Sequence, residues 1–117
     1  MKNLIALIII TLIAFSSSKV NAQKVKKKET IVIRTSSECN MCKERIEKEM
    51  AYTKGVISAT LDVEKAELTA IYKPHKTTPK KIREAISNLG YDADTIKANK
   101  EAYNQLPNCC QKGGMSH

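Results

Sequence analysis

One short stretch decides how this chain folds: Ser36-Ser37-Glu38-Cys39-Asn40-Met41-Cys42-Lys43-Glu44-Arg45-Ile46. Its two cysteines are separated by two residues, with a strand-like sequence before them and an amphipathic helical pattern after them. This order predicts Cys39 in a loop and Cys42 in the first turn of a helix. The free N–H groups and positive dipole end of a helix favour anions, and therefore thiolates. Thiolates bind soft metal ions and exchange with disulfides, so the stretch indicates metal handling or redox chemistry.

The sequence before this stretch has the features of an export signal. Residues 1–22 combine a basic residue, an apolar run over residues 4–15 and small residues ending at Ala22, so we expect cleavage of a signal peptide before Gln23. The apolar run is shorter than the about 20 residues that span a bilayer. We therefore expect a soluble protein of the periplasm, or a secreted one, that is not an integral membrane protein after cleavage. The alternative is an uncleaved membrane anchor.

The chain is basic, with a net charge of +8 at pH 7. Part of the excess lies in residues 23–29, a lysine-rich N-terminal arm that could touch anionic lipid or nucleic acid. Such runs are usually solvated tails, and export argues against nucleic acid. We expect a flexible arm and no nucleic-acid partner.

Strand-like and helix-like patterns alternate along the rest of the chain. Period-2 alternation predicts strands and spacings of three and four predict helices, which gives strand 30–35, helix 42–53, strands 56–63 and 68–72, helix 79–89 and strand 91–96. Thr78 and Gly90 are residue types that begin and end a helix. In the second strand, four apolar residues should share the buried face: Ile57, Ala59, Leu61 and Val63.

This order, β-α-β-β-α-β, predicts an α+β fold of the ferredoxin-like kind. Two helices would cover one face of a four-stranded antiparallel sheet. One small domain over residues 30–97 is long enough to form it. A C-terminal helical tail should follow over residues 98–117, with a helix at residues 99–106.

Five short motifs occur in order along residues 30–96: Cys39-x-x-Cys42, Lys54-Gly55-Val56, Asp62-Val63-Glu64-Lys65, Tyr72-Lys73-Pro74 and Leu89-Gly90-Tyr91. Together they resemble the heavy-metal-associated domain family of small copper chaperones and metal-ATPase domains. The resemblance implies that Cys39 and Cys42 are metal thiolates and that Tyr91 packs near them. With its signal peptide, the chain is also similar to the periplasmic mercury-binding proteins of this family.

The chain departs from the family pattern at two positions. Ser37 stands where the family usually has a methionine that packs under the loop, so we expect a looser loop rather than lost binding. Met41 could be a weak thioether ligand or could only cover the site. His75 should be a surface residue far from the site.

A second cysteine pair, Cys109 and Cys110, lies in the tail. The fourth strand should end at the pole opposite the first pair. Residues 97–108, if helical, would extend about 18 Å, close to the about 20 Å length of such a strand. We therefore predict that the tail returns to Cys39 and Cys42 and gives a metal site of three or four sulfurs. The alternatives are a separate tail site, a disulfide with the first pair, or thiols without a fixed place. A bond between neighbouring cysteines is strained.

These features favour an exported metal-binding protein that captures a thiophilic ion and transfers it by ligand exchange. Cu(I) leads by softness and resemblance, Hg(II) follows, and Zn(II) or Cd(II) would use four sulfurs. Met115 and His117 could add weak ligands. The expected partner is a membrane metal transporter or another metal-binding domain, and no motif indicates an enzyme. The alternatives are a thiol–disulfide oxidoreductase that uses the same cysteines, and a sequestering protein without a dedicated partner.

Overall fold

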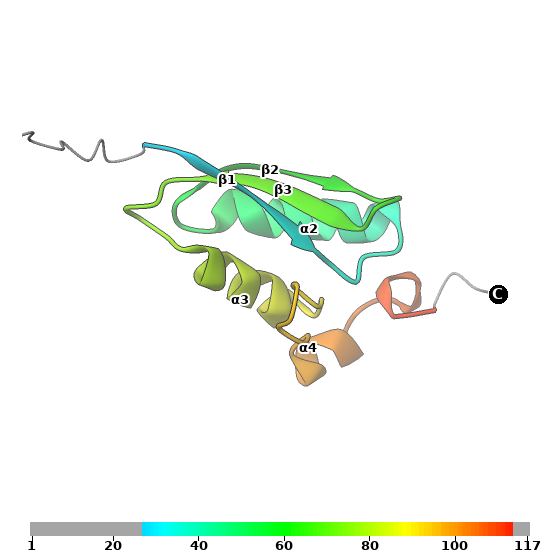
Figure 1. Ribbon diagram of the computed structural model, residues 1–117. Helices are drawn as coiled ribbons and strands as arrows, with labels where there is room; N and C mark the ends of the chain where they lie inside the picture. The colour runs from blue at the N-terminus through cyan, green and yellow to red at the C-terminus, as the bar shows by residue number, and fades with distance from the viewer. Residues whose placement is uncertain (1–26, 114–117) are drawn as a thin grey trace, which may run out of the picture.

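The computed structural model describes residues 27–113, and its main elements follow the predicted order (Figure 1). Five elements form the body of the domain: β1 (Glu29–Arg34), α2 (Asn40–Tyr52), β2 (Val56–Asp62), β3 (Glu67–Tyr72) and α3 (Pro79–Leu89). The tail adds a short helix, α4 (Lys100–Asn104), and a 3-10 turn, η1 (Asn108–Cys110). The predicted signal peptide, residues 23–26 of the basic arm, Met115 and His117 lie outside the described residues. Within the described part, no helix has the length and apolarity needed to cross a membrane.

The three strands form one antiparallel sheet in the order β1-β3-β2. Leu68 of β3 lies opposite Ile33 of β1 on one side and opposite Leu61 of β2 on the other, and all three side chains are buried. Helix α2 packs behind this sheet, and α3 packs beside α2 (Figure 1). The predicted α+β class and the hairpin of β2 and β3 are confirmed.

The start of β2 differs from the prediction. Its pairing with β3 shifts between Val56 and Ser58, which indicates a bulge. Because side chains alternate along a strand, the shift turns Val56 toward the core and leaves Ile57 41% exposed. The prediction that Ile57 shares the buried face is therefore wrong, whereas Leu61 is buried as predicted.

Both long helices bury the stripe that their residue spacing predicts. The Thr78 side chain accepts a hydrogen bond from the Lys81 N–H at the start of α3. Gly90 ends α3 with a φ of 112°, a left-handed conformation that glycine adopts without a Cβ clash. The fully buried helix residues are Cys42, Ile46 and Met50 in α2, and Ile82 and Ile86 in α3.

The predicted fourth strand over residues 91–96 does not form. In its place the described chain makes isolated bridges through Ala93, one of them to the residue after β1. Asp94 has a φ of 52°, which aspartate tolerates better than most residues. Its N–H donates to the Arg34 carbonyl, and its carboxylate accepts hydrogen bonds from the Arg34 N–H at 2.9 Å and from Arg83 Nε at 2.8 Å. These contacts limit the pairing with the end of β1 to the single bridge at Ala93, and the chain turns away at Asp94.

The tail therefore takes a shorter route than predicted. Because the chain turns at Asp94, beside the end of β1, it does not travel to the pole opposite the cysteines. Residues 97–108 do not form one continuous helix; α4 and η1 take its place. The tail begins at the cysteine end of the sheet and stays there (Figure 1).

The tail packs as part of the domain. A Cβ at Gly90 would lie 3.0 Å from the backbone of Ala102, so the end of α3 and helix α4 touch backbone to backbone. Beyond α4, Leu106 and Cys110 are buried in the same core as α2 and the sheet. This packing fixes where Cys110 lies.

Candidate metal centre

Buried hydroxyl groups hold the loop between β1 and α2. The Thr35 hydroxyl donates to the Ala66 carbonyl at 3.1 Å, and the Thr35 N–H donates to the same carbonyl at 2.7 Å. Ser37 shares a 2.8 Å hydrogen bond with Thr35 through its hydroxyl, and its N–H donates to Thr35 Oγ1. In place of the looser loop predicted for Ser37, the structure has a buried serine whose hydrogen bonds substitute for apolar packing.

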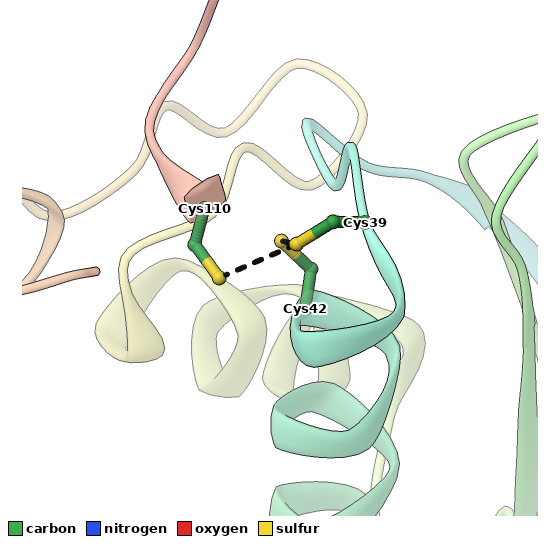
Figure 2. Close-up of side chains that lie close together, drawn as sticks. All are labelled: Cys39, Cys42 and Cys110. Atoms are coloured by element: carbon green, nitrogen blue, oxygen red, sulfur yellow. Dashed lines mark hydrogen bonds between the residues drawn. The ribbon is translucent and has the colours of Figure 1, made fainter. Parts of the chain in front are cut away.

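Three cysteine sulfurs converge at the start of α2 (Figure 2). Cys39 is the N-cap and Cys42 lies in the first turn, as predicted, and their Sγ atoms are 3.1 Å apart. Cys110 Sγ, from η1, lies 3.7 Å from Cys39 Sγ. All three sulfurs lie within 4.8 Å of one another, and all three residues are free thiols. Within residues 27–113, no other group of three or more such residues is placed to share a metal ion.

The spacing of these sulfurs suits one soft metal ion. A metal–sulfur bond of about 2.3 Å places the sulfurs of a planar three-coordinate ion about 4 Å apart. The separations of 3.1 and 3.7 Å differ from this by less than about 1 Å, which side-chain rotation can supply. Cys42 and Cys110 are 0% and 1% exposed and Cys39 is partly exposed, so an ion held there would be shielded from water on the side of Cys42 and Cys110.

Cys109 lies outside this cluster. Its Sγ is 3.6 Å from Met41 Sδ and 3.8 Å from Cys110 Sγ. Met41 is 47% exposed and Cys109 is partly exposed, so this pair of sulfurs lies toward the surface. Three of the four predicted cysteines thus come together, and the fourth lies beside the thioether whose role the sequence left open.

Charged groups fasten the end of the tail beside the cluster. Lys112 Nζ donates to the Asp92 carboxylate at 2.7 Å, and the Gly113 N–H donates to the Glu38 carboxylate at 3.0 Å. Burial alone would raise the pKa of Asp92, but the Lys112 ammonium and the Ala98 N–H hold that pKa below its ordinary value. Asp92 is therefore ionised at neutral pH and binds Lys112.

A buried phenol faces the thiols. Tyr91 is fully buried, and its hydroxyl has no hydrogen-bond partner among the described residues. Burial raises the pKa of this hydroxyl, and the Cys110 and Cys42 thiols beside it raise the pKa further. Burial, with Cys42 alongside, also raises the pKa of the Cys110 thiol. A metal ion would have to displace the thiol proton, and the phenol could then donate a hydrogen bond to a thiolate.

One further prediction concerns a residue outside the site, and one set of contacts at the site was not predicted. His75 is exposed in the connection between β3 and α3, as predicted. The tail contacts of Asp92, Lys112 and Glu38 were missed, because ordinary charged residues far apart in sequence carry no local pattern.

Comparison with known proteins identifies the family. The heavy-metal-associated domain profile matches residues 38–92. The Copper chaperone CopZ of Staphylococcus haemolyticus is 32% identical over 54 residues, which are 46% of this chain and 79% of that protein. This chain belongs to the heavy-metal-associated domain family. The matched range of the profile includes Cys39, Cys42 and Tyr91 and ends before the tail.

Two further comparisons show how much of this heavy-metal-associated protein matches other proteins. The Copper-exporting P-type ATPase of Staphylococcus epidermidis is 34% identical over 67 residues, and the match covers 57% of this chain but only 8% of the ATPase. The crystal structure of oxidized MerP from Ralstonia metallidurans CH34 is 19% identical with a TM-score of 0.55, over 57% of this chain and 94% of that one. At this identity the likeness to MerP shows the fold.

Breaking the ion pair of Asp92 and Lys112 should expose the Cys110 thiol. Asp92→Asn removes the charge that holds Lys112, so the tail should open more often. Loss of an ion pair worth about 0.5–1 kcal/mol raises the open population about two- to fivefold. We expect Cys110 to react with iodoacetamide faster by the same factor. The rate is measured anaerobically on the reduced protein by peptide mass spectrometry. Lys100→Ala, which removes an exposed lysine of the same surface, should leave it unchanged. Equal rates in wild type and Asp92→Asn would show that packing alone holds the tail.

Proposed function

We propose that this protein captures one thiophilic ion, with Cu(I) as the first candidate, and transfers it to a partner by ligand exchange. The observation that supports this most directly is the convergence of the Cys39, Cys42 and Cys110 sulfurs at the start of α2. Thiolates are soft ligands that select Cu(I) over the harder divalent ions. Cys42 and Cys110 are buried and Cys39 is partly exposed, and all three are free thiols that offer such ligands close together.

The choice among ions depends on the number of ligands. Zn(II) prefers four ligands in a tetrahedron, and Cd(II) would be held in the same way. The fourth cysteine, Cys109, has its sulfur against Met41, so the geometry favours an ion with fewer ligands. Hg(II) is also thiophilic and is the second candidate. Copper ranks first because the relatives above 30% identity are named a copper chaperone and a copper-exporting ATPase.

The ion would move to its partner by exchange of sulfurs. A partner thiolate binds the ion first, and one of this chain's cysteines then dissociates, so that no free ion is released. The partner would be a membrane metal transporter or another metal-binding domain, because the similar proteins carry those two kinds of name. Thiols and one phenol are groups for binding and exchange, and we propose no enzymatic activity.

A thiol–disulfide oxidoreductase is the second candidate, and one observation favours it. The Cys39 and Cys42 sulfurs are 3.1 Å apart at a helix N-terminus, where oxidation to a disulfide is feasible. Faster reduction of insulin by dithiothreitol in the presence of the protein would decide for this candidate.

We also propose that the chain is exported to the periplasm, or secreted, after removal of residues 1–22. Expressed from its full sequence in a bacterium, the protein should be recovered from the periplasm with an intact mass that begins at Gln23. Ala22→Leu, which replaces the small residue at the cleavage site, should block cleavage and serves as the control. A cytoplasmic product that keeps residues 1–22 would contradict export.

Removing the third sulfur should weaken Cu(I) binding without abolishing it. We expect Cys110→Ser to raise the dissociation constant about ten- to hundredfold, equivalent to about 1.4–2.8 kcal/mol, because a serine oxygen is a hard ligand. Cys39→Ser or Cys42→Ser should remove tight binding. The measurement is anaerobic competition with a Cu(I) chelator, and native mass spectrometry counts the bound ions.

Cys109→Ser is the matched control for this experiment. It changes the neighbouring residue of the same turn and leaves the three clustered sulfurs in place. Equal affinities of wild type and Cys110→Ser would show that the tail supplies no ligand. If the wild-type protein holds no thiophilic ion at all, the proposed function is wrong.

A further inference from the structure

We propose that Met41 and Cys109 form a surface loading site through which Cu(I) reaches and leaves the buried thiols. We call these two residues the surface sulfur pair. The inference rests on the proposed function and adds a path for the ion. It concerns a thioether and a thiol whose sulfur atoms touch at 3.6 Å, outside the cluster of Cys39, Cys42 and Cys110.

Burial limits direct access to two of the three clustered thiols, whereas Cys39 is partly exposed. Cys42 and Cys110 are 0% and 1% exposed, because η1 packs over the start of α2. The surface sulfur pair is accessible, since Met41 is 47% exposed and Cys109 is partly exposed. A molecule that delivers Cu(I) from solution can therefore touch Met41 and Cys109 while the tail stays in place.

The exposure of Met41 also argues against a role as packing material. Methionine commonly fills irregular gaps in a core, but about half of this side chain faces solvent. Its sulfur atom instead contacts a second sulfur, Cys109 Sγ. Two soft donors side by side at the surface form a site that suits a soft cation.

The sulfur atoms form a continuous row from the surface sulfur pair to the cluster. Successive separations are 3.6 Å from Met41 to Cys109, 3.8 Å from Cys109 to Cys110 and 3.7 Å from Cys110 to Cys39. One ion bonded to two sulfurs at about 2.3 Å each can span up to about 4.6 Å. Every gap in the row is shorter than this, so a single ion can bridge each neighbouring pair without movement of the backbone.

Along the row, each new copper–sulfur bond replaces an earlier bond until the last sulfur adds as a third ligand. The ion first binds Met41 Sδ and Cys109 Sγ as the ligands that delivered it leave, and the Cys109 thiol releases its proton to water. A bond to Cys110 then forms with loss of that thiol's proton, and the bond to Met41 breaks. A bond to Cys39 forms with loss of its proton, and the bond to Cys109 breaks, so that the Cys109 thiolate regains a proton from water. Cys42 loses its proton and binds last as the third ligand. The ion stays Cu(I) throughout, and no electron is transferred.

The test measures rates as well as affinity. Wild type, Cys109→Ser and Met41→Leu are mixed anaerobically with Cu(I) held by bicinchoninate, and loading is followed by stopped-flow absorbance. We expect each sulfur variant to load about tenfold more slowly, because serine and leucine offer Cu(I) no soft donor. Leucine keeps the volume of methionine. Removal of the ion by excess chelator should slow by the same factor, so the affinity and the one-ion stoichiometry should not change.

Asn108→Ala is the matched control, because it alters an exposed side chain of η1 without removing a sulfur, and it should load at the wild-type rate. A wild-type loading rate in Cys109→Ser would overturn the proposal and place loading at the partly exposed Cys39. Faster loading in Asp92→Asn with no effect of Cys109→Ser would also overturn it, in favour of opening of the tail. A lower affinity or stoichiometry in Cys109→Ser would make Cys109 a ligand of the resident ion instead.

The two proposals fail in different ways. Tight Cu(I) binding with unchanged rates in both sulfur variants refutes only the surface loading site. Absence of Cu(I) binding to the wild-type protein refutes both.

Discussion

The cysteine end of this domain depends on the close approach of two backbone segments, at Gly90 and at Ala102. Any Cβ at position 90 would lie 3.0 Å from the Ala102 carbonyl group, and the φ of 112° there disfavours every residue with a side chain. Glycine meets both conditions, so α3 can end where α4 packs on it. From this contact the chain needs only a few residues to bury Leu106 and to place Cys110 at the start of α2.

The tail changes what a pair of cysteines can do. With two sulfurs, a third enters only when a partner's thiolate joins the ion. Here Cys110 Sγ already lies 3.7 Å from Cys39 Sγ, so the chain itself places a third sulfur beside the pair. On our proposal, the ion leaves toward the Cys109 and Met41 sulfurs, so its bonds to Cys39 and Cys42 break before its bond to Cys110. The ion pair of Lys112 and Asp92 helps to hold the tail in place during this exchange. Because the pair is partly exposed, salt and water weaken it.

The sequence predicted the parts of the fold that local patterns determine. Alternation, helical spacing and end residues predicted β1 to β3, α2 and α3, and the spacing of Cys39 and Cys42 predicted their place at the start of α2. The predicted fourth strand is replaced by a turn at Asp94, whose carboxylate binds Arg83. This contact joins two separate elements, so no local pattern in the sequence indicates it. No residue type in the sequence indicates the bulge that exposes Ile57. Chain length alone predicted that the tail cysteines could reach Cys39 and Cys42. Which of them does so depends on the 3-10 turn, which directs Cys110 to the cluster and Cys109 to Met41.

X-ray absorption spectroscopy of the Cu(I)-loaded protein tests the central claim most directly, because it counts the sulfurs bound to the ion. We predict three sulfurs at about 2.3 Å in wild type, and two at a shorter distance once the Cys110 sulfur is replaced by oxygen. Two sulfurs in the wild-type protein would contradict the account, because Cys110 would then lie beside the ion without binding it.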